Sequence, residues 1–265
     1  MSMDKRLCVI CAWRQHCQKR YSLSYDSISM QCPDFTRDYT IKDLEADRKA
    51  LEQQLEKWRQ EGKPKKYRPC ITVSREAGAG ASEICRKLAD ELKMDLIGSQ
   101  IIARIAESAN MSEKVVSMLD EKKISMLDSW IQSFFNARHL WPDVYLQHLI
   151  KVIRAGAGEY GNAIIMGRGA QFILPPEKIF RVRFIAPLEK RIEHVMKNRG
   201  ISYDEAKAYI IKTDNDRSAF IMKYFHEDVT NPAHYDLVLN TGDISVEEAA
   251  KIVKEAYLAK KFTTT

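Results

Sequence analysis

Short apolar runs alternate with amphipathic stretches from about residue 68 to the C-terminus. The runs CITVS (70–74), AIIMG (163–167), IFRVRFIA (179–186) and YDLVLNT (235–241) predict buried parallel strands. Apolar residues at helical spacing predict helices over 82–94, 101–121, 124–157, 187–199, 202–225 and 245–260. Strands that alternate with helices predict an α/β fold with a doubly wound parallel sheet. Such sheets bind ligands at the carboxyl ends of their strands.

Two of the predicted helices begin with a capping box. Ser202 precedes Glu205, and Ser245 precedes Glu248, each pair at the start of an apolar-periodic run. In this motif the serine hydroxyl accepts a bond from the backbone N–H three residues on, and the glutamate bonds back. The two pairs therefore mark helix starts near 202 and 245.

The chain before residue 68 has a different character. Residues 1–40 are rich in cysteine and aromatic residues and show little periodicity, so we expect a small Cys-rich module there. Thr40 is a candidate cap for a helix from about 41 to 60, and a basic linker follows to residue 67. The main domain is expected over 68–265, with a helical insert near 112–157 that contributes to substrate binding.

Composition and charge narrow the class of protein. The 265 residues are 45% hydrophobic and carry a net charge of +6, nearly all of it before Cys70. The cluster from Lys57 to Arg68 is either a solvated linker or a footprint for phosphate or nucleic acid. The nearly neutral remainder makes a large DNA-binding face unlikely. No apolar run reaches the roughly 18–20 residues of a membrane span, and no signal peptide is apparent, so we expect a cytoplasmic protein.

Four N-terminal cysteines form a candidate metal site: Cys8, Cys11, Cys17 and Cys32. A C-x₂-C turn lets two thiolates bind one ion, and two more cysteines complete a tetrahedral set. Zinc or an iron–sulfur cluster would fit, with His16 as an alternative ligand. The other interpretation is four reduced cysteines without a metal. Cys70 and Cys85 fall on a strand and a helix and are expected to pack in the core.

A glycine-rich segment, R-E-A-G-A-G-A-S over 75–82, follows the first predicted strand. Backbone N–H groups of such a loop, together with a helix N-terminus, can surround phosphate oxygens. Against the pattern G-x-x-x-x-G-K-[ST], Gly80 and Ser82 match, whereas Arg75 replaces the first glycine and Ala81 replaces the lysine. The alternative is a tight turn between strand and helix with no ligand.

Five collinear blocks resemble the cytidylate kinase-like family: ITVSREAGAGASEICRKLADEL, MGRGAQFILPP, RVRFIAPLEKRIEHVM, IIKTDNDRSAFIMKYF and YDLVLNTGDISVEEAA. The resemblance covers about Cys70 to Ala259. It implies a P-loop NTPase-like fold and an ATP- and Mg²⁺-dependent phosphoryl transfer to a nucleoside monophosphate, for which CMP is one candidate, or to a related small molecule. The expected partners are therefore a nucleotide and a small-molecule phosphate acceptor.

The resemblance also implies roles for individual residues. Gly78, Gly80 and Ser82 would cradle phosphate and Mg²⁺, and Arg168 would bind the acceptor phosphate, unless it is only a surface residue that caps a helix. Arg191 and Arg217 would stabilise the transferring group. Asp214 would either orient Arg217, three residues along a helix, or contact substrate.

The absence of a lysine at Ala81 leaves open whether the loop supports catalysis. Such a lysine neutralises charge that develops in the transition state. Arg75 and Arg86 are the nearby cations that would replace it, and we expect both to face solvent near the start of helix 82–94. The alternative function is a nucleotide-binding regulatory or sensor protein with little or no turnover, coupled to the four-cysteine module. A third, weaker alternative is a nucleic-acid-associated protein.

Overall fold

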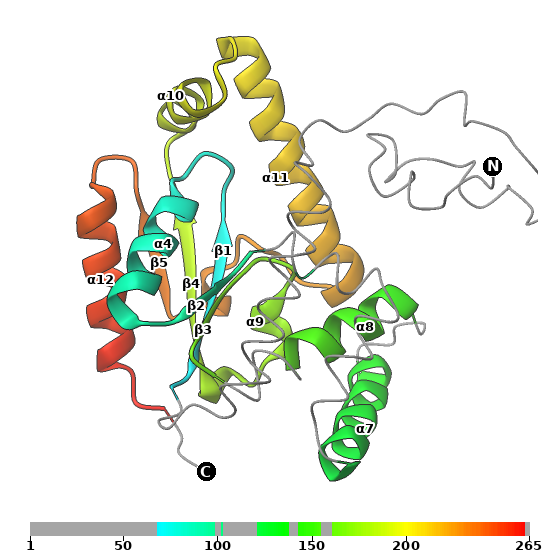
Figure 1. Cartoon of the computed structure of the whole chain (residues 1–265). Helices are drawn as coiled ribbons and strands as arrows, with labels where there is room; N and C mark the ends of the chain where they lie inside the picture. The colour runs from blue at the N-terminus through cyan, green and yellow to red at the C-terminus, as the bar shows by residue number, and fades with distance from the viewer. Residues whose placement is uncertain (1–67, 99–101, 103–120, 138–142, 155–160, 263–265) are drawn as a thin grey trace, which may run out of the picture. The chain divides into compact units, whose positions relative to one another are not determined.

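The structure is a computed structural model, which describes residues 68–98, 102, 121–137, 143–154 and 161–262 (Figure 1). The chain divides into two compact units, Met1–Lys57 and Trp58–Thr265, and all the described residues belong to the second. The predicted Cys-rich module (1–40) and the helical connector and linker (41–67) lie outside the described residues. Most of the helix predicted over 101–121 also lies outside them.

A five-stranded parallel sheet forms the centre of the described unit. Its strands are β1 (Cys70–Arg75), β2 (Asp95–Ile97), β3 (Ala163–Met166), β4 (Ile179–Ile185) and β5 (Leu237–Asn240). They lie in the order β2-β3-β1-β4-β5, and every pairing is parallel. This order confirms the predicted doubly wound sheet. The carboxyl ends of all five strands therefore lie along one edge of the sheet, with that of β1 in the middle.

Helices connect the strands and cover both faces of the sheet. They are α4 (Ala81–Leu92), α7 (Glu121–Ala137), α8 (Val144–Val152), α9 (Ala170–Ile173), α10 (Leu188–Arg199), α11 (Tyr203–Phe225) and α12 (Val246–Ala259), with 3₁₀ turns η2 (Pro176–Lys178) and η3 (Pro232–His234). Both predicted capping boxes are present, at Ser202 and Ser245. They fix the starts of α11 and α12 within a residue of the sequence prediction.

The prediction of a single helix over 124–157 is wrong. Two helices, α7 and α8, occupy this stretch, and α8 begins after Asp143. The Asp143 carboxylate accepts a hydrogen bond from the Leu146 N–H at 2.8 Å, which is a standard N-cap contact. In the sequence Pro142 precedes this aspartate, and a proline disfavours helical backbone at the residue before it. The Pro-Asp pair was therefore the missed signal for a break.

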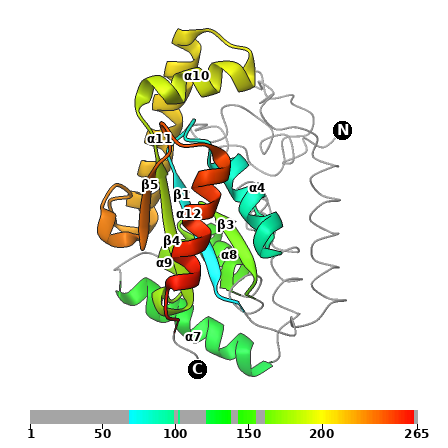
Figure 2. The ribbon, with the colours of Figure 1, turned by 90° about the vertical axis from the view of Figure 1, so that its left-hand side faces the viewer.

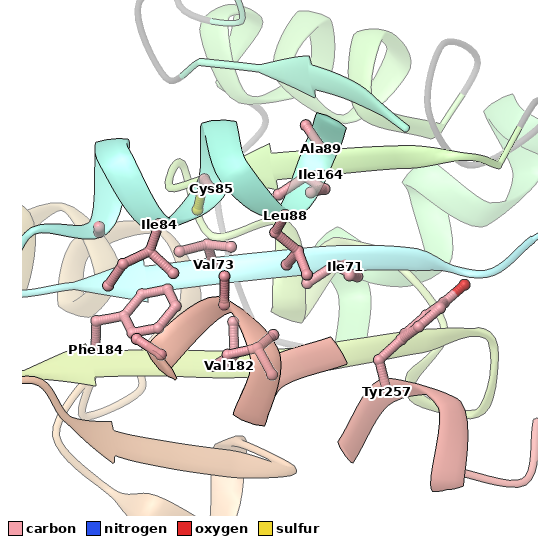
Figure 3. Packing of buried hydrophobic residues seen from close by; sticks show 14 of the residues in the cluster. Ile71, Val73, Ile84, Cys85, Leu88, Ala89, Ile164, Val182, Phe184 and Tyr257 are labelled. Atoms are coloured by element: carbon pink, nitrogen blue, oxygen red, sulfur yellow. The ribbon is translucent and has the colours of Figure 1, made fainter. Parts of the chain in front are cut away.

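The main hydrophobic core lies between the sheet and the helix pair α4 and α12, which cover one face (Figures 2 and 3). Ile71, Val73, Val182 and Phe184 of the sheet pack against Ile84 and Leu88 of α4 and Val253 of α12. Cys70 and Cys85 are buried as expected, and burial raises the pKa of each thiol to about 12. This apolar sandwich fixes the position of β1 and of the helix that follows it.

An aromatic cluster joins the helices on the opposite face, where α9 and α11 lie (Figure 1). Phe225, at the end of α11, contacts Phe134 of α7 at 6.1 Å and Phe172 of α9 at 5.3 Å between ring centroids. Phe134 and Phe135 are buried, and Trp130 packs on Phe134. The cluster anchors the C-terminal end of α11 beside β3 and α9.

Candidate active site

The glycine-rich segment forms a tight loop between β1 and α4. Gly78 and Gly80 both have positive φ, +86° and +68°, which a side chain disfavours. A Cβ at Gly78 would lie 2.6 Å from the Arg191 carbonyl oxygen, because α10 packs directly on the loop there. Gly80 is the N-cap residue of α4, and Ser82 is exposed in the first turn. The loop thus has the backbone form of an anion-binding strand–loop–helix unit.

Strands β4 and β5 hold this loop from one side. The Glu76 N–H donates to the Phe184 carbonyl at 3.0 Å, and the Glu76 carboxylate accepts from the Ala186 N–H at 3.1 Å. From the end of β5, the Thr241 hydroxyl donates to the carbonyl oxygens of Ala79 and Ile185, at 2.9 and 3.1 Å. These bonds fix both ends of the loop to the edge of the sheet.

Helices α10 and α11 hold the loop from the other side, through Asp214. Its carboxylate accepts from the Ala77 N–H at 2.8 Å, and its second oxygen lies 2.6 Å from an Arg191 terminal nitrogen. Arg217, one turn further along α11, lies 3.5 Å from the same carboxylate. The Ala77 side chain also packs with Ile192 of α10 in a small apolar cluster. Asp214 therefore orients both arginines and the loop.

Arg191 supports the loop in this structure. Besides Asp214, its guanidinium lies 3.4 Å from the Ala77 carbonyl oxygen and 3.5 Å from a Glu76 carboxylate oxygen. Only 12% of its side chain is exposed. These contacts hold Arg191 against the loop. The role that the resemblance implies for it, stabilising the transferring group, stays a prediction.

One face of α11 passes along the ends of β1 and β3. Asp214 contacts the loop, and Arg217 donates to the Arg75 carbonyl at 3.0 Å. Phe220 lies 5.4 Å from the guanidinium carbon of Arg168, which follows β3. Phe225 packs on Gly169. Residues three or four apart are neighbours on a helix surface, so Asp214, Arg217 and Phe220 follow one another along α11. This single helix thus contacts both the loop and the turn after β3.

The turn after β3 has an unusual backbone. Gly167, Arg168 and Gly169 all have positive φ, at 77°, 55° and 69°. The Gly167 N–H donates to the Val73 carbonyl at 2.8 Å, which ties the turn to β1. A Cβ at Gly169 would lie 2.2 Å from the Phe225 ring. Gly169, and not Arg168, is the N-cap residue of α9. The turn presents Arg168 at the sheet edge, and strained backbone of this kind is common at functional sites.

Three guanidinium groups gather at the ends of β1 and β3, and we call Arg75, Arg168 and Arg217 the arginine cluster. Burial and the charges of Arg217 and Arg168 lower the pKa of Arg75 to about 9, so the group remains charged at neutral pH. Burial also lowers the pKa of Arg217, although Asp214 partly offsets it. Like charges that lie close together in a partly buried site favour the binding of an anion there.

The expectation that Arg75 and Arg86 both face solvent is half wrong. Arg86 is exposed on the outer face of α4. Arg75 is only partly exposed, because its side chain lies among the cluster arginines and close to Cys85. The sequence analysis also missed Arg183, which is 6% exposed and donates to the Ser74 hydroxyl at 3.0 Å. A charged residue within the apolar run of β4 was the available signal.

The described residues offer neither a cluster of metal-ligating side chains nor a membrane-spanning helix. They contain no group of three or more His, Cys, Asp or Glu side chains that could hold a metal ion. Cys8, Cys11, Cys17 and Cys32 lie outside the described residues, so their metal site stays a prediction. The exposed Ser82 hydroxyl is available to Mg²⁺, which takes most of its ligands from water and substrate phosphates. None of the helices described here is long and apolar enough to cross a membrane.

A parallel sheet in this order, with a glycine loop after its central strand and arginines at the strand ends, defines an α/β P-loop NTPase-like fold. The chain belongs to the cytidylate kinase-like family, whose family profile matches residues 70–243. This membership confirms the resemblance seen in the sequence. Together with the kinase relatives, it supports phosphoryl transfer of the nucleotide kinase type.

Individual relatives agree with the family assignment. The cytidylate kinase of Ignicoccus hospitalis is 24% identical over 189 residues, which cover 71% of this chain and 98% of that protein. The cytidylate kinase of Pyrococcus horikoshii is 27% identical over 186 residues, covering 70% and 86%. A crystal structure of an uncharacterized protein from Eubacterium ventriosum superposes with a TM-score of 0.55 and 17% identity, over 73% of this chain and all of that one. That likeness concerns the fold alone.

Proposed function

We propose that the α/β domain transfers a phosphoryl group from ATP to a nucleoside monophosphate, with CMP as the first acceptor to test. The observation that carries this proposal is the arginine cluster, which lies beside the glycine loop at the ends of two neighbouring strands. Phosphoryl transfer requires little covalent chemistry from the protein. It requires positive charge held in fixed geometry around the reacting phosphates.

In this proposal the residues of the site have different roles. Amides of the loop and of the first turn of α4 would bind the phosphates of ATP, and Arg168 would hold the acceptor phosphate. Arg217 would stabilise the transferring group, oriented by its bonds to Asp214 and to the Arg75 carbonyl. Bound Mg²⁺ would neutralise phosphate charge, with Ser82 as its protein ligand. Asp214 and Arg191 would keep the loop in place.

The test is a coupled assay of ADP release. The full chain is incubated with ATP, Mg²⁺ and each nucleoside monophosphate in turn, with ATP alone as the blank. We expect ADP release above the blank with at least one monophosphate, CMP first. A chain that binds ATP but releases no ADP with any of them would contradict the proposal.

One observation favours a second candidate, a nucleotide sensor with little turnover. Ala81 stands where a P-loop lysine would supply catalytic charge. In this alternative the four-cysteine segment would hold zinc or an iron–sulfur cluster and transmit the signal. It predicts ATP binding without ADP release.

The metal is tested separately from the activity. Metal analysis of the purified chain should find about one equivalent of zinc, or a brown chromophore after preparation without oxygen. Substitution Cys11→Ser should release the metal and leave the unfolding of the α/β domain unchanged. Metal-free protein with full activity would remove the module from the proposal.

A further inference from the structure

The position of Ala81 does not suit a cationic side chain. Its side chain is 5% exposed and belongs to the main core, together with Ile84 and Leu88. A lysine there would enter an apolar environment, which is costly for an ammonium group. The apolar packing around position 81 thus suits alanine better than lysine. If the loop binds a polyphosphate, another residue must neutralise it.

Two of the nearby cations are poorly placed for this task. Arg86 is exposed on α4, on the face away from the buried residues Cys85 and Leu88. Arg191 is packed behind the loop, where it binds Asp214, Glu76 and the Ala77 carbonyl. Neither arrangement directs a guanidinium towards the strand ends where phosphate would lie.

Arg75 is better placed. It is the last residue of β1 and directly precedes the loop, and in the sheet register it pairs with Phe184 of β4. Its carbonyl oxygen accepts the bond from Arg217, so its backbone is held from two sides. Its side chain lies close enough to Arg168 and Arg217 for their charges to act on it. Arg75 thus directly precedes the glycine loop, on the strand that pairs with β3, and Arg168 follows β3.

We propose that Arg75 takes the place of the loop lysine and binds the phosphate chain of the donor nucleotide, between the glycine loop and Arg168. This inference rests on the proposed function, because it assigns a residue within the same site. It extends that function by naming the source of a charge that the loop itself lacks. A planar guanidinium would hold two phosphate oxygens at once, whereas a lysine acts as a single point of charge.

The electrostatics of Arg75 give the proposal a distinctive signature. Its pKa is lowered in the folded state, to about 9, first by burial and then by Arg217 and Arg168. A cation whose pKa falls on folding destabilises the fold at every pH at which it is charged, neutral pH included. A bound polyphosphate would remove this penalty. An arginine that served only to hold the fold together would have the opposite effect on stability.

The experiment compares thermal unfolding of four full-length proteins: wild type, Arg75→Met, the rival Arg86→Met, and Lys87→Met as a control for loss of one exposed charge on α4. Each is heated alone, with sodium tripolyphosphate, and with ATP and Mg²⁺. For Arg75→Met we expect a Tm without ligand that is equal to or above that of wild type. We also expect it to lose most of the rise in Tm that either ligand gives wild type. Arg86→Met and Lys87→Met should keep that rise.

Turnover separates failure of this inference from failure of the proposed function. We expect Arg75→Met to lose at least a hundredfold in ADP release, with Arg75→Lys between it and wild type. A lower Tm for Arg75→Met with the ligand-induced rise intact would overturn the inference and make Arg75 structural. Full turnover by Arg75→Met would also overturn it while leaving the proposed function standing. A wild type that shows the Arg75-dependent rise in Tm, but no turnover, would overturn the function and keep the inference.

Discussion

The glycine loop and the Gly167–Gly169 turn follow neighbouring strands, yet they are held in different ways. Hydrogen bonds and ion pairs from residues distant in sequence fix the loop, chiefly through Asp214 and Thr241. Close packing fixes the turn, because Phe225 lies where a side chain at Gly169 would have to go. The donor side of the site therefore depends on charge and polar contacts in addition to the close approach of α10 at Gly78. The acceptor side depends mainly on shape.

This difference has a consequence for how the two sides respond to change. Polar contacts can be weakened by salt or by removal of one charge, while the loop backbone keeps its path. Steric fit at a buried turn cannot be weakened by salt, and a single added methyl group alters it. The two sides are joined by α11, which contributes both Asp214 and Phe225. Substitutions that remove a charge from the donor side should thus depend on salt, whereas substitutions at the turn should not.

The largest effect is expected for Gly169→Ala, which tests the steric side. The added Cβ would lie 2.2 Å from the Phe225 ring, at a φ of +69°. Overpacking costs about 1–3 kcal/mol and the left-handed backbone about 1–2 kcal/mol more. The free energy of unfolding in denaturant should fall by about that sum, at low and high salt alike.

Gly200→Ala is the matched control for Gly169→Ala. Gly200 has a similar φ of +65°, but no atom lies within 4 Å of its added Cβ. It should therefore show only the backbone cost of about 1–2 kcal/mol. In a Phe225→Leu background the Gly169→Ala substitution should cost less than in wild type. Equal losses at Gly169 and Gly200 would contradict steric control of the turn.

The second prediction concerns Asp214→Asn, which tests the polar side. The amide keeps the shape of the carboxylate but removes the anion that Arg191 and Arg217 share, and Arg191 retains only the Glu76 carboxylate at 3.5 Å. Loss of a charge-assisted contact of this kind costs about 1.5–3 kcal/mol. We expect a lower free energy of unfolding and a large loss of ADP release.

Salt should reduce the difference in free energy of unfolding between wild type and Asp214→Asn, because the Asp214 carboxylate is partly exposed. The corresponding difference for Gly169→Ala should not change with salt. Asp216→Asn is the control, since residue 216 lies on a different face of the same helix. If Asp216→Asn had the same effect, general charge on α11 rather than the Asp214 contacts would explain the result.

The third prediction concerns Arg168→Lys, at the tip of the turn. A lysine cannot reproduce a bidentate contact with phosphate, so binding of the acceptor should weaken about 10- to 100-fold. Binding of ATP, measured by calorimetry without acceptor, should hardly change. Equal weakening of both ligands would place Arg168 on the donor side and break the comparison.

The sequence predicted most of the helices and strands but few of the side-chain contacts between them. Four strands and both capping boxes could be predicted because apolar runs and local hydrogen-bond partners are visible within a few residues. Strand β2 was missed because it has only three residues, Asp95–Ile97. The Asp214 bond to the Ala77 N–H joins residues 137 positions apart, and periodicity carries no information on such pairs. The contacts of Arg191 with Glu76 and the Ala77 carbonyl could not be predicted for the same reason.

The smallest effect is expected for Thr241→Val, which removes one polar support of the loop and keeps its shape. The hydroxyl donates to the carbonyl oxygens of Ala79 and Ile185, and valine would leave both without that donor. A neutral hydrogen bond contributes about 0.5–1.5 kcal/mol, so the free energy of unfolding should fall by roughly 1 kcal/mol. Because the bond is uncharged, this loss should be the same at low and high salt, unlike that of Asp214→Asn. Thr230→Val, at an exposed turn bonded only to Asp228, is the control for the loss of a threonine hydroxyl. ATP affinity should fall slightly for Thr241→Val and not at all for Thr230→Val. A larger loss for Thr241→Val than for Asp214→Asn would mean that the β5 side, and not the α11 side, holds the loop.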